Sequence, residues 1–272
     1  MARLCVANCQ GCREGEQALR PGRNSRMCFA CSGALFICRC RFSEGCTSVG
    51  SHMLTIVTLN WARPEYLLTN LYRYSFFTIV DRIICFNNGP PLTRTPQLSV
   101  KCTLIQSSEN LGLYARLAAA SLARTDAIFH TDDDIWVPEA TLNSLVASWA
   151  RAPLSCHALH GRIARPAYVA KDVFGPVEVV LTRAVVCSRR TNNVALSVTP
   201  QFDDIVGLPY GNGEDIILSF AAMSVSRSPN FAYRLPAENH PVNPNTAIHR
   251  RWTGQAKHRQ RVISRCRQIF SL

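Results

Sequence analysis

The stretch AIFHTDDDIWVP, residues 127–138, contains three consecutive aspartates. A short apolar run precedes Asp132, Asp133 and Asp134, and an isoleucine and a tryptophan follow them. The apolar run predicts a buried strand that ends at the aspartates. Adjacent carboxylates repel one another, so a fold gains no stability from this run unless a positive partner lies beside it. The run is therefore a candidate site for a bound cation.

Strands and helices alternate around this stretch. Residues 54–59, LTIVTL, are apolar and β-branched throughout, which is typical of a strand buried on both faces. Pro64 then favours the first turn of a helix. The alternation predicts an α/β fold with a mixed, mostly parallel sheet flanked by helices. Further strands are expected over residues 78–86, 99–106 and 126–130, and further helices over residues 110–123 and 137–150.

Polar side chains stand where three of these strands end. Asn60 follows the first strand, Asn87 and Asn88 follow the second, and the aspartates follow the strand at residues 126–130. Ligands of parallel α/β sheets lie beyond the carboxyl ends of the strands. We therefore expect these side chains to meet at one edge of the sheet.

The second half of the chain is less regular. Residues 177–187 are a strand candidate, and residues 211–225, GNGEDIILSFAAMSV, predict a loop that leads into a helix. Glu214 and Asp215 would occupy its first turn, where the helix dipole favours acids. The basic residues near the C-terminus are expected to form a last helix.

Positive charge is concentrated at the two ends. Residues 1–49 carry +4 and residues 249–272 carry +7, so the net charge of +12 leaves only +1 for residues 50–248. A nucleic-acid-binding domain would normally be basic itself, so no nucleic-acid partner is expected. Binding of nucleic acid by the cysteine-rich head and the basic tail stays open as an alternative.

Eight of the thirteen cysteines lie in residues 1–49. Cys9, Cys12, Cys28 and Cys31 have the spacing of a zinc ribbon, although the segment lacks an apolar face and also fits a poorly structured leader. GSHM, residues 50–53, matches a common cloning remnant, and whether residues 1–52 are native stays open. We expect residues 1–52 to lie outside the functional domain. No apolar run is long enough to predict a membrane span.

The aspartate run suits a hard divalent cation. Mn²⁺ and Mg²⁺ prefer oxygen ligands and often bind substrate phosphates as well. Alternate side chains of an extended turn share one side, so Asp132 and Asp134 are expected to converge on one ion while Asp133 points elsewhere. The competing interpretations are a solvated acidic turn and a helix N-cap.

Several motifs occur in an order that resembles the exostosin-type glycosyltransferase domain, glycosyltransferase family 64, in its stand-alone form. They are IVTLNWARPEYLL, IICFNNG, NLGLYAR, IFHTDDDI and GNGEDIILSF, followed by a terminal segment rich in His, Arg and Cys. The resemblance implies a GT-A fold over residues 53–272, with a nucleotide-binding half at 53–151 and an acceptor-binding half at 152–272. It also implies a UDP-sugar donor, typically UDP-N-acetylhexosamine, Mn²⁺, and transfer to a hydroxyl acceptor with retention of configuration.

The resemblance assigns donor-binding roles to particular residues. Asp132 and Asp133 would touch the ribose and the sugar, and Asp134 would hold the metal. The other expected donor-binding residues are Thr58, Asn60 and Arg63 after the first strand, Asn88 after the second, and Asn110 and Arg116 around the following helix.

The reacting centre is expected at the acid pair. By the resemblance, Asp215 beside Glu214 would lie near the anomeric carbon, as a nucleophile or as an anion that stabilises positive charge. An arginine of the tail would meet the departing diphosphate, because a guanidinium grips phosphate in two places. Arg259 and Arg261 are the candidates, with Arg250 as the fallback.

One departure from the family bears on the compartment. Exostosin-type domains often carry a cysteine just before the acid pair, and Gly213 stands there in this chain, which leaves Cys266 without that partner. The resemblance implies the Golgi or the endoplasmic reticulum lumen, whereas no signal or anchor is visible and a cytoplasmic location stays open. A catalytically silent relative that binds nucleotide or glycan is the main alternative function.

Overall fold

A computed structural model describes residues 27–29, 35–37, 52–92, 100–205, 212–241 and 254–272. The chain divides into two compact units, Met1–Gly50 and Ser51–Leu272, and the expected functional domain over residues 53–272 stays a prediction. In the first unit, β1 (Met27–Phe29) pairs antiparallel with β2 (Leu35–Ile37). Cys9, Cys12 and Cys31 lie outside the described residues, so the zinc site stays a prediction.

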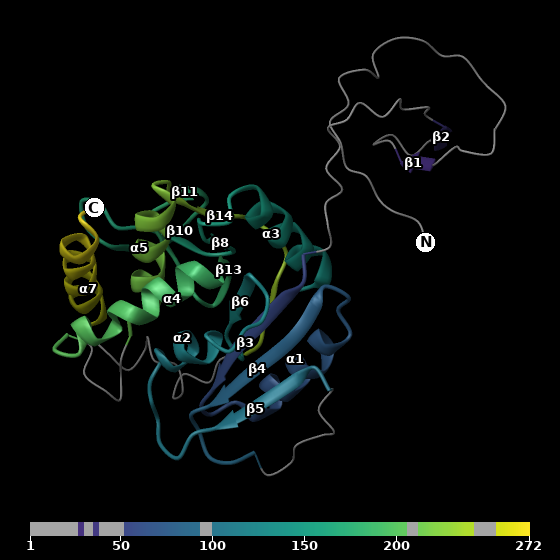
Figure 1. Cartoon of the computed structure of the whole chain (residues 1–272), viewed down its shortest axis with the longest axis horizontal. Coiled ribbons are helices and arrows are strands. Elements are labelled where there is room, and N and C mark those ends of the chain that lie inside the picture. Colours follow the sequence, from purple (N-terminus) through teal and green to yellow (C-terminus); the bar gives the residue numbers. More distant parts are fainter. Residues whose placement is uncertain (1–26, 30–34, 38–51, 93–99, 206–211, 242–253) are drawn as a thin grey trace, which may run out of the picture. The chain divides into compact units, whose positions relative to one another are not determined.

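The second unit is built on an eight-stranded sheet with the order β11-β14-β8-β13-β6-β3-β4-β5 (Figure 1). Neighbours are parallel from β6 through β3 and β4 to β5, whereas β13 runs antiparallel to both of its neighbours. The prediction of a mixed, mostly parallel sheet is confirmed. The strands are β3 (Leu54–Asn60), β4 (Val80–Asn87), β5 (Cys102–Gln106), β6 (Ala127–Thr131), β8 (His157–Ala158), β11 (Gly175–Val177), β13 (Ala184–Ser188) and β14 (Asn230–Ala232).

Helices cover both faces of this sheet and enclose two apolar cores. Alternate residues of a strand point to opposite faces, so Ile56 of β3 belongs to the core that includes residues of α1 and α3, while Val57 belongs to the core that includes residues of α2, α4, α5 and α7. This two-sided burial explains the continuous apolar run of β3. The helices are α1 (Pro64–Ser75), α2 (Ala115–Ala120), α3 (Glu139–Arg151), α4 (Arg189–Val198), the 3₁₀ helix η1 (Thr199–Phe202), α5 (Glu214–Ser226) and α7 (Gln255–Phe270).

The strand expected over residues 177–187 differs in the structure. It is divided into β12 (Val179–Val180) and β13, which pair in different sheets. β12 joins β9 (Gly161–Ile163) and β10 (Val169–Val173) in a small sheet, while β13 enters the large sheet beside β6. Residues 181–183 cross between the two sheets, and an apolar run gives no sign of such a crossing.

The carboxyl ends of β3, β4 and β6 adjoin at one edge of the sheet. Thr58 pairs with Thr131 across β3 and β6, and Asn60 pairs with Asn87 across β3 and β4. The side chain of Asn60 donates to that of Asn87 over 2.7 Å. The expected gathering of polar strand ends is therefore confirmed. Within the described ranges, no helix is both long enough and apolar enough to cross a membrane.

His130 gives the fold an acid-sensitive element. Its side chain is fully buried in β6, and burial, assisted by the charge of Arg116, lowers its pKa to about 3. As the pH falls through about 6.5, His130 becomes protonated in the unfolded chain but stays neutral in the folded chain. The stability from this residue is therefore present above pH 6.5 and is lost as the pH falls toward 3.

We predict that His130→Phe flattens the dependence of the free energy of unfolding on pH between 6.5 and 5. The parent should lose on the order of 2 kcal/mol over this interval from this group. Urea unfolding at several pH values measures the slope, and the exposed His52 changed to Gln serves as the control. Equal slopes for His130→Phe and the parent would contradict the prediction.

Candidate functional site

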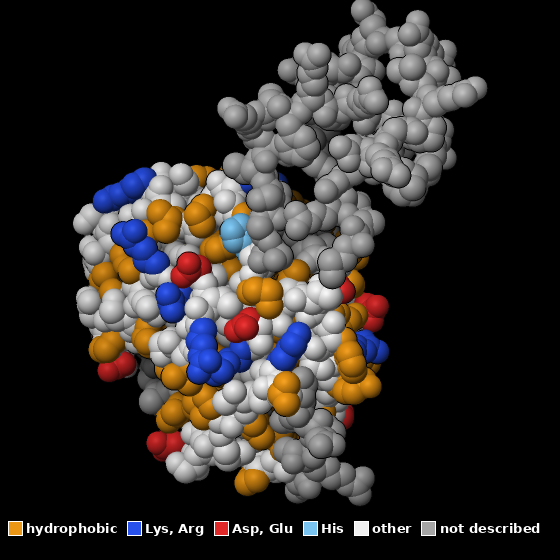
Figure 2. All heavy atoms as spheres, turned by 45° about the vertical axis from the view of Figure 1, so that its right-hand side comes forward, with side chains coloured by type: hydrophobic (Ala, Val, Ile, Leu, Met, Phe, Trp, Pro, Cys, Tyr) orange, Lys and Arg blue, Asp and Glu red, His pale blue; other side chains and the backbone are white. Residues whose placement is uncertain are grey.

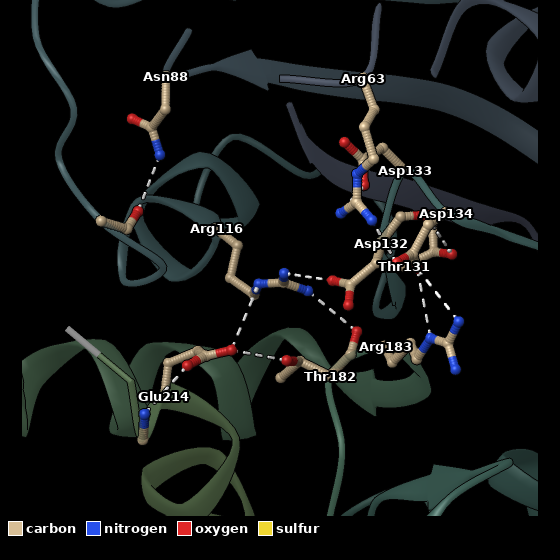
Figure 3. Close-up of polar contacts among 12 residues, drawn as sticks. Arg63, Asn88, Arg116, Thr131, Asp132, Asp133, Asp134, Thr182, Arg183 and Glu214 are labelled. Carbon is tan, nitrogen blue, oxygen red and sulfur yellow. Dashed lines mark hydrogen bonds and ion pairs between the residues drawn. The ribbon is translucent and has the colours of Figure 1, made fainter. Parts of the chain in front are cut away.

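Each aspartate of the run faces an arginine (Figure 3). Asp132 pairs with Arg116, and Asp133 and Asp134 share Arg63. Arg183 lies on the other side of Asp134. Three guanidinium groups thus balance three carboxylates, which explains how like charges are held together at the end of a buried strand.

Arg63 joins two neighbouring carboxylates with its two terminal nitrogens. Its Nη2 lies 2.5 Å from Asp133 Oδ1, and its Nη1 lies 2.5 Å from Asp134 Oδ2. The planar fork of a guanidinium suits this double contact because it presents two terminal nitrogens, whereas a lysine presents one. Arg63 therefore groups Asp133 with Asp134, whereas the alternation of an extended turn predicts a grouping of Asp132 with Asp134.

Arg116 connects the aspartate run to the acid pair. Its Nη2 contacts Asp132 Oδ1 at 2.6 Å, and its Nη1 donates to the backbone oxygen of Thr182 over 2.9 Å. Its Nε lies 3.8 Å from Glu214 Oε1, which also accepts from the Thr182 hydroxyl over 2.8 Å. The Arg116 side chain is only 2% exposed. It is expected from the family resemblance to reach the donor, and the structure places it in an enclosed network between the two acidic groups.

Burial and these ion pairs shift the pKa values of the site. Burial opposes the charge of Asp132, but Arg116 pulls its pKa below the ordinary value. Burial raises the pKa of Asp133 to about 7 against the attraction of Arg63. Burial and the neighbouring Asp215 raise the pKa of Glu214, and Arg116 opposes this rise. Carboxyl groups of one site therefore differ in their readiness to hold a proton, as in many sites of acid–base chemistry.

Side chains that the sequence analysis missed fix the backbone of the aspartate run. The buried Asn70 amide donates to the backbone oxygens of Asp133 and Ile135 over 3.0 and 3.1 Å. His240 completes this support, since its Nε2 lies 3.1 Å from Asn70 Oδ1 and its backbone N–H donates to the backbone oxygen of Asp134 over 2.9 Å. A signal was available for Asn70, because it is a polar residue on the apolar face of the predicted helix.

His240 reaches the run through a short strand pair. β15 (Glu238–Asn239) pairs antiparallel with β7 (Ile135–Trp136), which directly follows the aspartates. The His240 ring also stacks on Tyr66 of α1 at a centroid distance of 4.6 Å. No feature of the sequence indicates that residues a hundred positions downstream support this turn.

Thr182 and Arg183 were also missed. β13 pairs antiparallel with β6, with Ala184 opposite Thr131, so the residue before β13 faces the residue after β6. The backbone confirms this extension, because Asp132 N–H donates to the Arg183 oxygen over 3.1 Å. The register of one strand pair thus brings residues 182 and 183 to the aspartates.

The acid pair begins α5. Gly213 before it has φ 140°, a conformation that L side chains rarely adopt, and an added Cβ would approach Val262 to 3.1 Å. This requirement accounts for glycine at the position where the family often carries cysteine. The Asp215 carboxylate pairs with Arg259 of α7 at 2.6 Å, and both side chains are buried.

Arg259 is held on three sides. Besides Asp215, it donates to Asn212 Oδ1 over 2.7 Å, and its guanidinium lies 4.6 Å from the centre of the Tyr168 ring. Arg261 lies elsewhere, exposed on α7, where it lines a surface groove of about 420 Å³ with Lys257. Arg250 lies outside the described residues.

The remaining donor-binding candidates line the same edge of the sheet. Asn88 donates to the Gly112 oxygen over 2.9 Å and accepts from the Leu111 N–H over 3.1 Å. Asn110 accepts from the Gly112 N–H over 2.9 Å. These amides shape the loop before α2, while Thr58 and Asn60 are buried near the end of β3. A nucleoside role for any of them stays a prediction.

In the described part of the chain, no three His, Cys, Asp or Glu side chains form a group that could hold a metal ion by themselves. The donor chemistry of the run nevertheless fits a hard divalent cation that takes its other ligands from phosphate and water. Asp132 offers Oδ2, since its ion pair engages Oδ1, and its side chain is 31% exposed. Asp134 would have to share its oxygens with Arg63 and Arg183.

The cysteines of the described second unit are free thiols. Cys85, Cys156, Cys187 and Cys266 are buried and Cys102 is half-buried. Burial raises the pKa of the Cys102 thiol to about 11, so it is protonated at neutral pH. Buried thiols of this kind usually have a packing role.

The structure thus presents a mixed α/β sheet with polar side chains gathered at one edge and two acidic groups linked there through Arg116. The family model described as "Glycosyl transferase family 64 domain" matches residues 54–271, and the chain belongs to this family. The expected membership of the exostosin-type family is thereby confirmed.

Comparison with known proteins adds a structural likeness. The chain resembles "Mannosyltransferase PcManGT from Pyrobaculum calidifontis in complex with GDP-Man and Mn2+", with a TM-score of 0.46 and 14% identity. The likeness covers 66% of this chain and 54% of that one, so the chain spans about half the length of the protein it matches. No curated protein matches.

We predict that Arg116→Met destabilises the fold strongly, because it leaves the buried Glu214 and the partly exposed Asp132 without their shared cation. The expected loss is about 3–5 kcal/mol in the free energy of unfolding. The matched control is Arg189→Met, since Arg189 forms an exposed pair with Asp126 and should cost less than about 1 kcal/mol. Urea unfolding of both variants measures the difference, and similar losses would refute a special role for Arg116.

Proposed function

We propose that the chain is a retaining glycosyltransferase that moves a sugar from a UDP donor to a hydroxyl of a glycan or other acceptor. An N-acetylhexosamine is the expected sugar from the family resemblance. The transfer depends on a divalent metal, Mn²⁺ or Mg²⁺. The observation that carries the proposal is the pair of acidic groups, the aspartate run and Glu214–Asp215, joined through Arg116 at the ligand edge of the sheet.

Asp134 and Asp132 are the proposed metal ligands. A bound divalent cation would neutralise the negative charge of the diphosphate leaving group. Arg63 and Arg183 lie against Asp134 and are partly open to solvent, with side chains 20% and 26% exposed. Both can therefore turn from the carboxylate to a phosphate oxygen.

Asp215 is the proposed catalytic carboxylate. Its Oδ2 pairs with Arg259, and its Oδ1 accepts from the Ile216 N–H over 2.8 Å. Both oxygens are engaged, which favours a fixed anion that stabilises the positive charge of an oxocarbenium-like transition state over a mobile nucleophile. Glu214 orients Thr182 and Arg116 through its contacts with both side chains. Arg259 holds Asp215 in place through their ion pair.

The alternative functions are nucleic-acid binding and a catalytically silent relative. On the face in Figure 2, basic, acidic and apolar side chains are interspersed, so this face lacks the continuous basic surface that a nucleic-acid binder needs. A catalytically silent relative would also keep the Arg116 network for its fold, so the turnover screen below separates it from an active enzyme. By family resemblance we propose the Golgi or endoplasmic reticulum lumen as the location, with the cytoplasm as the alternative.

We predict Mn²⁺-dependent release of UDP from a UDP-sugar in a screen across UDP-sugars. Asp134→Asn should reduce turnover by about 100-fold or more, because it removes the proposed metal ligand. The control is Asp126→Asn, an exposed aspartate that pairs with Arg189 outside the site. Failure to bind or turn over any UDP-sugar, or parental activity of Asp134→Asn, would overturn the proposed function.

We also predict that Asp215→Asn lowers kcat by about 100-fold with a donor KM within about threefold of the parent, since the variant keeps the shape and loses the charge. Proton NMR of the product should show the anomeric configuration of the donor. An inverted product, or a change confined to KM, would argue against this role.

A further inference from the structure

Arg183 is not among the donor-binding residues that the family resemblance implies, yet it faces the proposed metal ligand. Its Nε and Nη2 both lie 3.3 Å from Asp134 Oδ1. Arg63 occupies the other oxygen, Oδ2, at 2.5 Å. Two guanidinium groups therefore approach one carboxylate from different sides, as Figure 3 shows for Arg183.

The three arginines of the run differ in accessibility. Arg116 is enclosed, with 2% of its side chain exposed, and its contacts join three parts of the fold. Arg63 and Arg183 are ten or more times as exposed, at 20% and 26%. A ligand at this edge can thus reach Arg63 and Arg183, while Arg116 remains a structural cation.

Charge sets a limit on what the run can bind. Three guanidinium groups already face the three carboxylates of the run, so a divalent cation would add two positive charges to a cluster that already holds its own cations. A cation that takes Asp134 Oδ1 must also displace the Arg183 guanidinium from that oxygen. The released guanidinium is a bidentate phosphate donor next to the site.

We propose that Arg183 is a diphosphate-binding residue that competes with the divalent cation for Asp134. The inference rests on the proposed function, since it assigns the diphosphate of a nucleotide-sugar to this edge. Arg183 weakens cation binding to the run, and it strengthens binding of the nucleoside diphosphate even without a metal. The enzyme therefore depends less on the metal for donor binding than an aspartate run alone would require.

The position of Arg183 follows from the register of the sheet. It stands immediately before β13, whose first residue pairs with the last residue of β6. Its backbone oxygen is fixed by the Asp132 N–H, so the side chain starts from a defined point beside the run. Arg189, just after β13, has the same chemistry at the other end of the strand and pairs with Asp126.

The test uses Arg183→Gln and Arg183→Lys, with Arg189→Gln as the matched control. Binding of Mn²⁺ alone is measured by electron paramagnetic resonance of the free ion. Binding of UDP alone is measured by calorimetry in EDTA. We expect Arg183→Gln to bind Mn²⁺ about three- to tenfold more tightly and UDP about three- to tenfold more weakly than the parent. The affinities of Arg183→Lys for both ligands should lie between those of Arg183→Gln and the parent, and those of Arg189→Gln should match the parent.

Competition predicts opposite changes in the two affinities, tighter for Mn²⁺ and weaker for UDP. Damage to the fold would instead weaken the binding of both ligands. Unchanged or weaker Mn²⁺ binding by Arg183→Gln, unchanged UDP binding, or absence of Mn²⁺ binding in every protein overturns the inference. A failure of either expected change in Arg183→Gln leaves sugar transfer by the parent intact. The proposed function fails separately, if no UDP-sugar is turned over.

Discussion

The structure depends on one buried guanidinium. Arg116 joins the end of β6, the crossing between two sheets at Thr182, and the start of α5 at Glu214. Desolvating an arginine is costly unless carboxylates and carbonyls surround it, and here they come from segments far apart in the sequence. The positive charge of Arg116 thus holds these segments together and also stabilises Asp132 and Glu214 at the edge of the sheet where the polar strand ends gather.

The aspartate run is a balanced cluster. Its carboxylates would repel one another, and the arginines that neutralise them also restrict what can bind. Arg116 is enclosed and serves the fold, whereas Arg63 and Arg183 are partly exposed and are available to a ligand. The demands of stability and of binding are therefore divided among three residues of one type.

The backbone of the run is as constrained as its charges. Asn70 binds the carbonyls on both sides of Asp134, and His240 closes the arrangement from β15. A turn held from two directions keeps its carboxylates in place without help from a ligand. Such preorganisation is what electrostatic stabilisation of a transferring group requires.

Much of the scaffold was predictable because its signals are local. The runs at β3 and β6, the helix opened by Pro64 and the acids at the start of α5 follow from side-chain periodicity and from backbone preference. The edge where the polar strand ends gather also followed, since parallel strands end on the same side. The division of residues 177–187 between two sheets did not follow, because an apolar run is compatible with either pairing.

The sequence by itself determined the class of fold, the ligand edge and the acidic residues placed there. The tertiary structure alone decided which cation faces which acid. It set Arg116 between Asp132 and Glu214, and it brought Arg183 to Asp134 through the register of β13. The physical reason is that periodicity reports burial within one segment, whereas an ion pair depends on the relative placement of several segments.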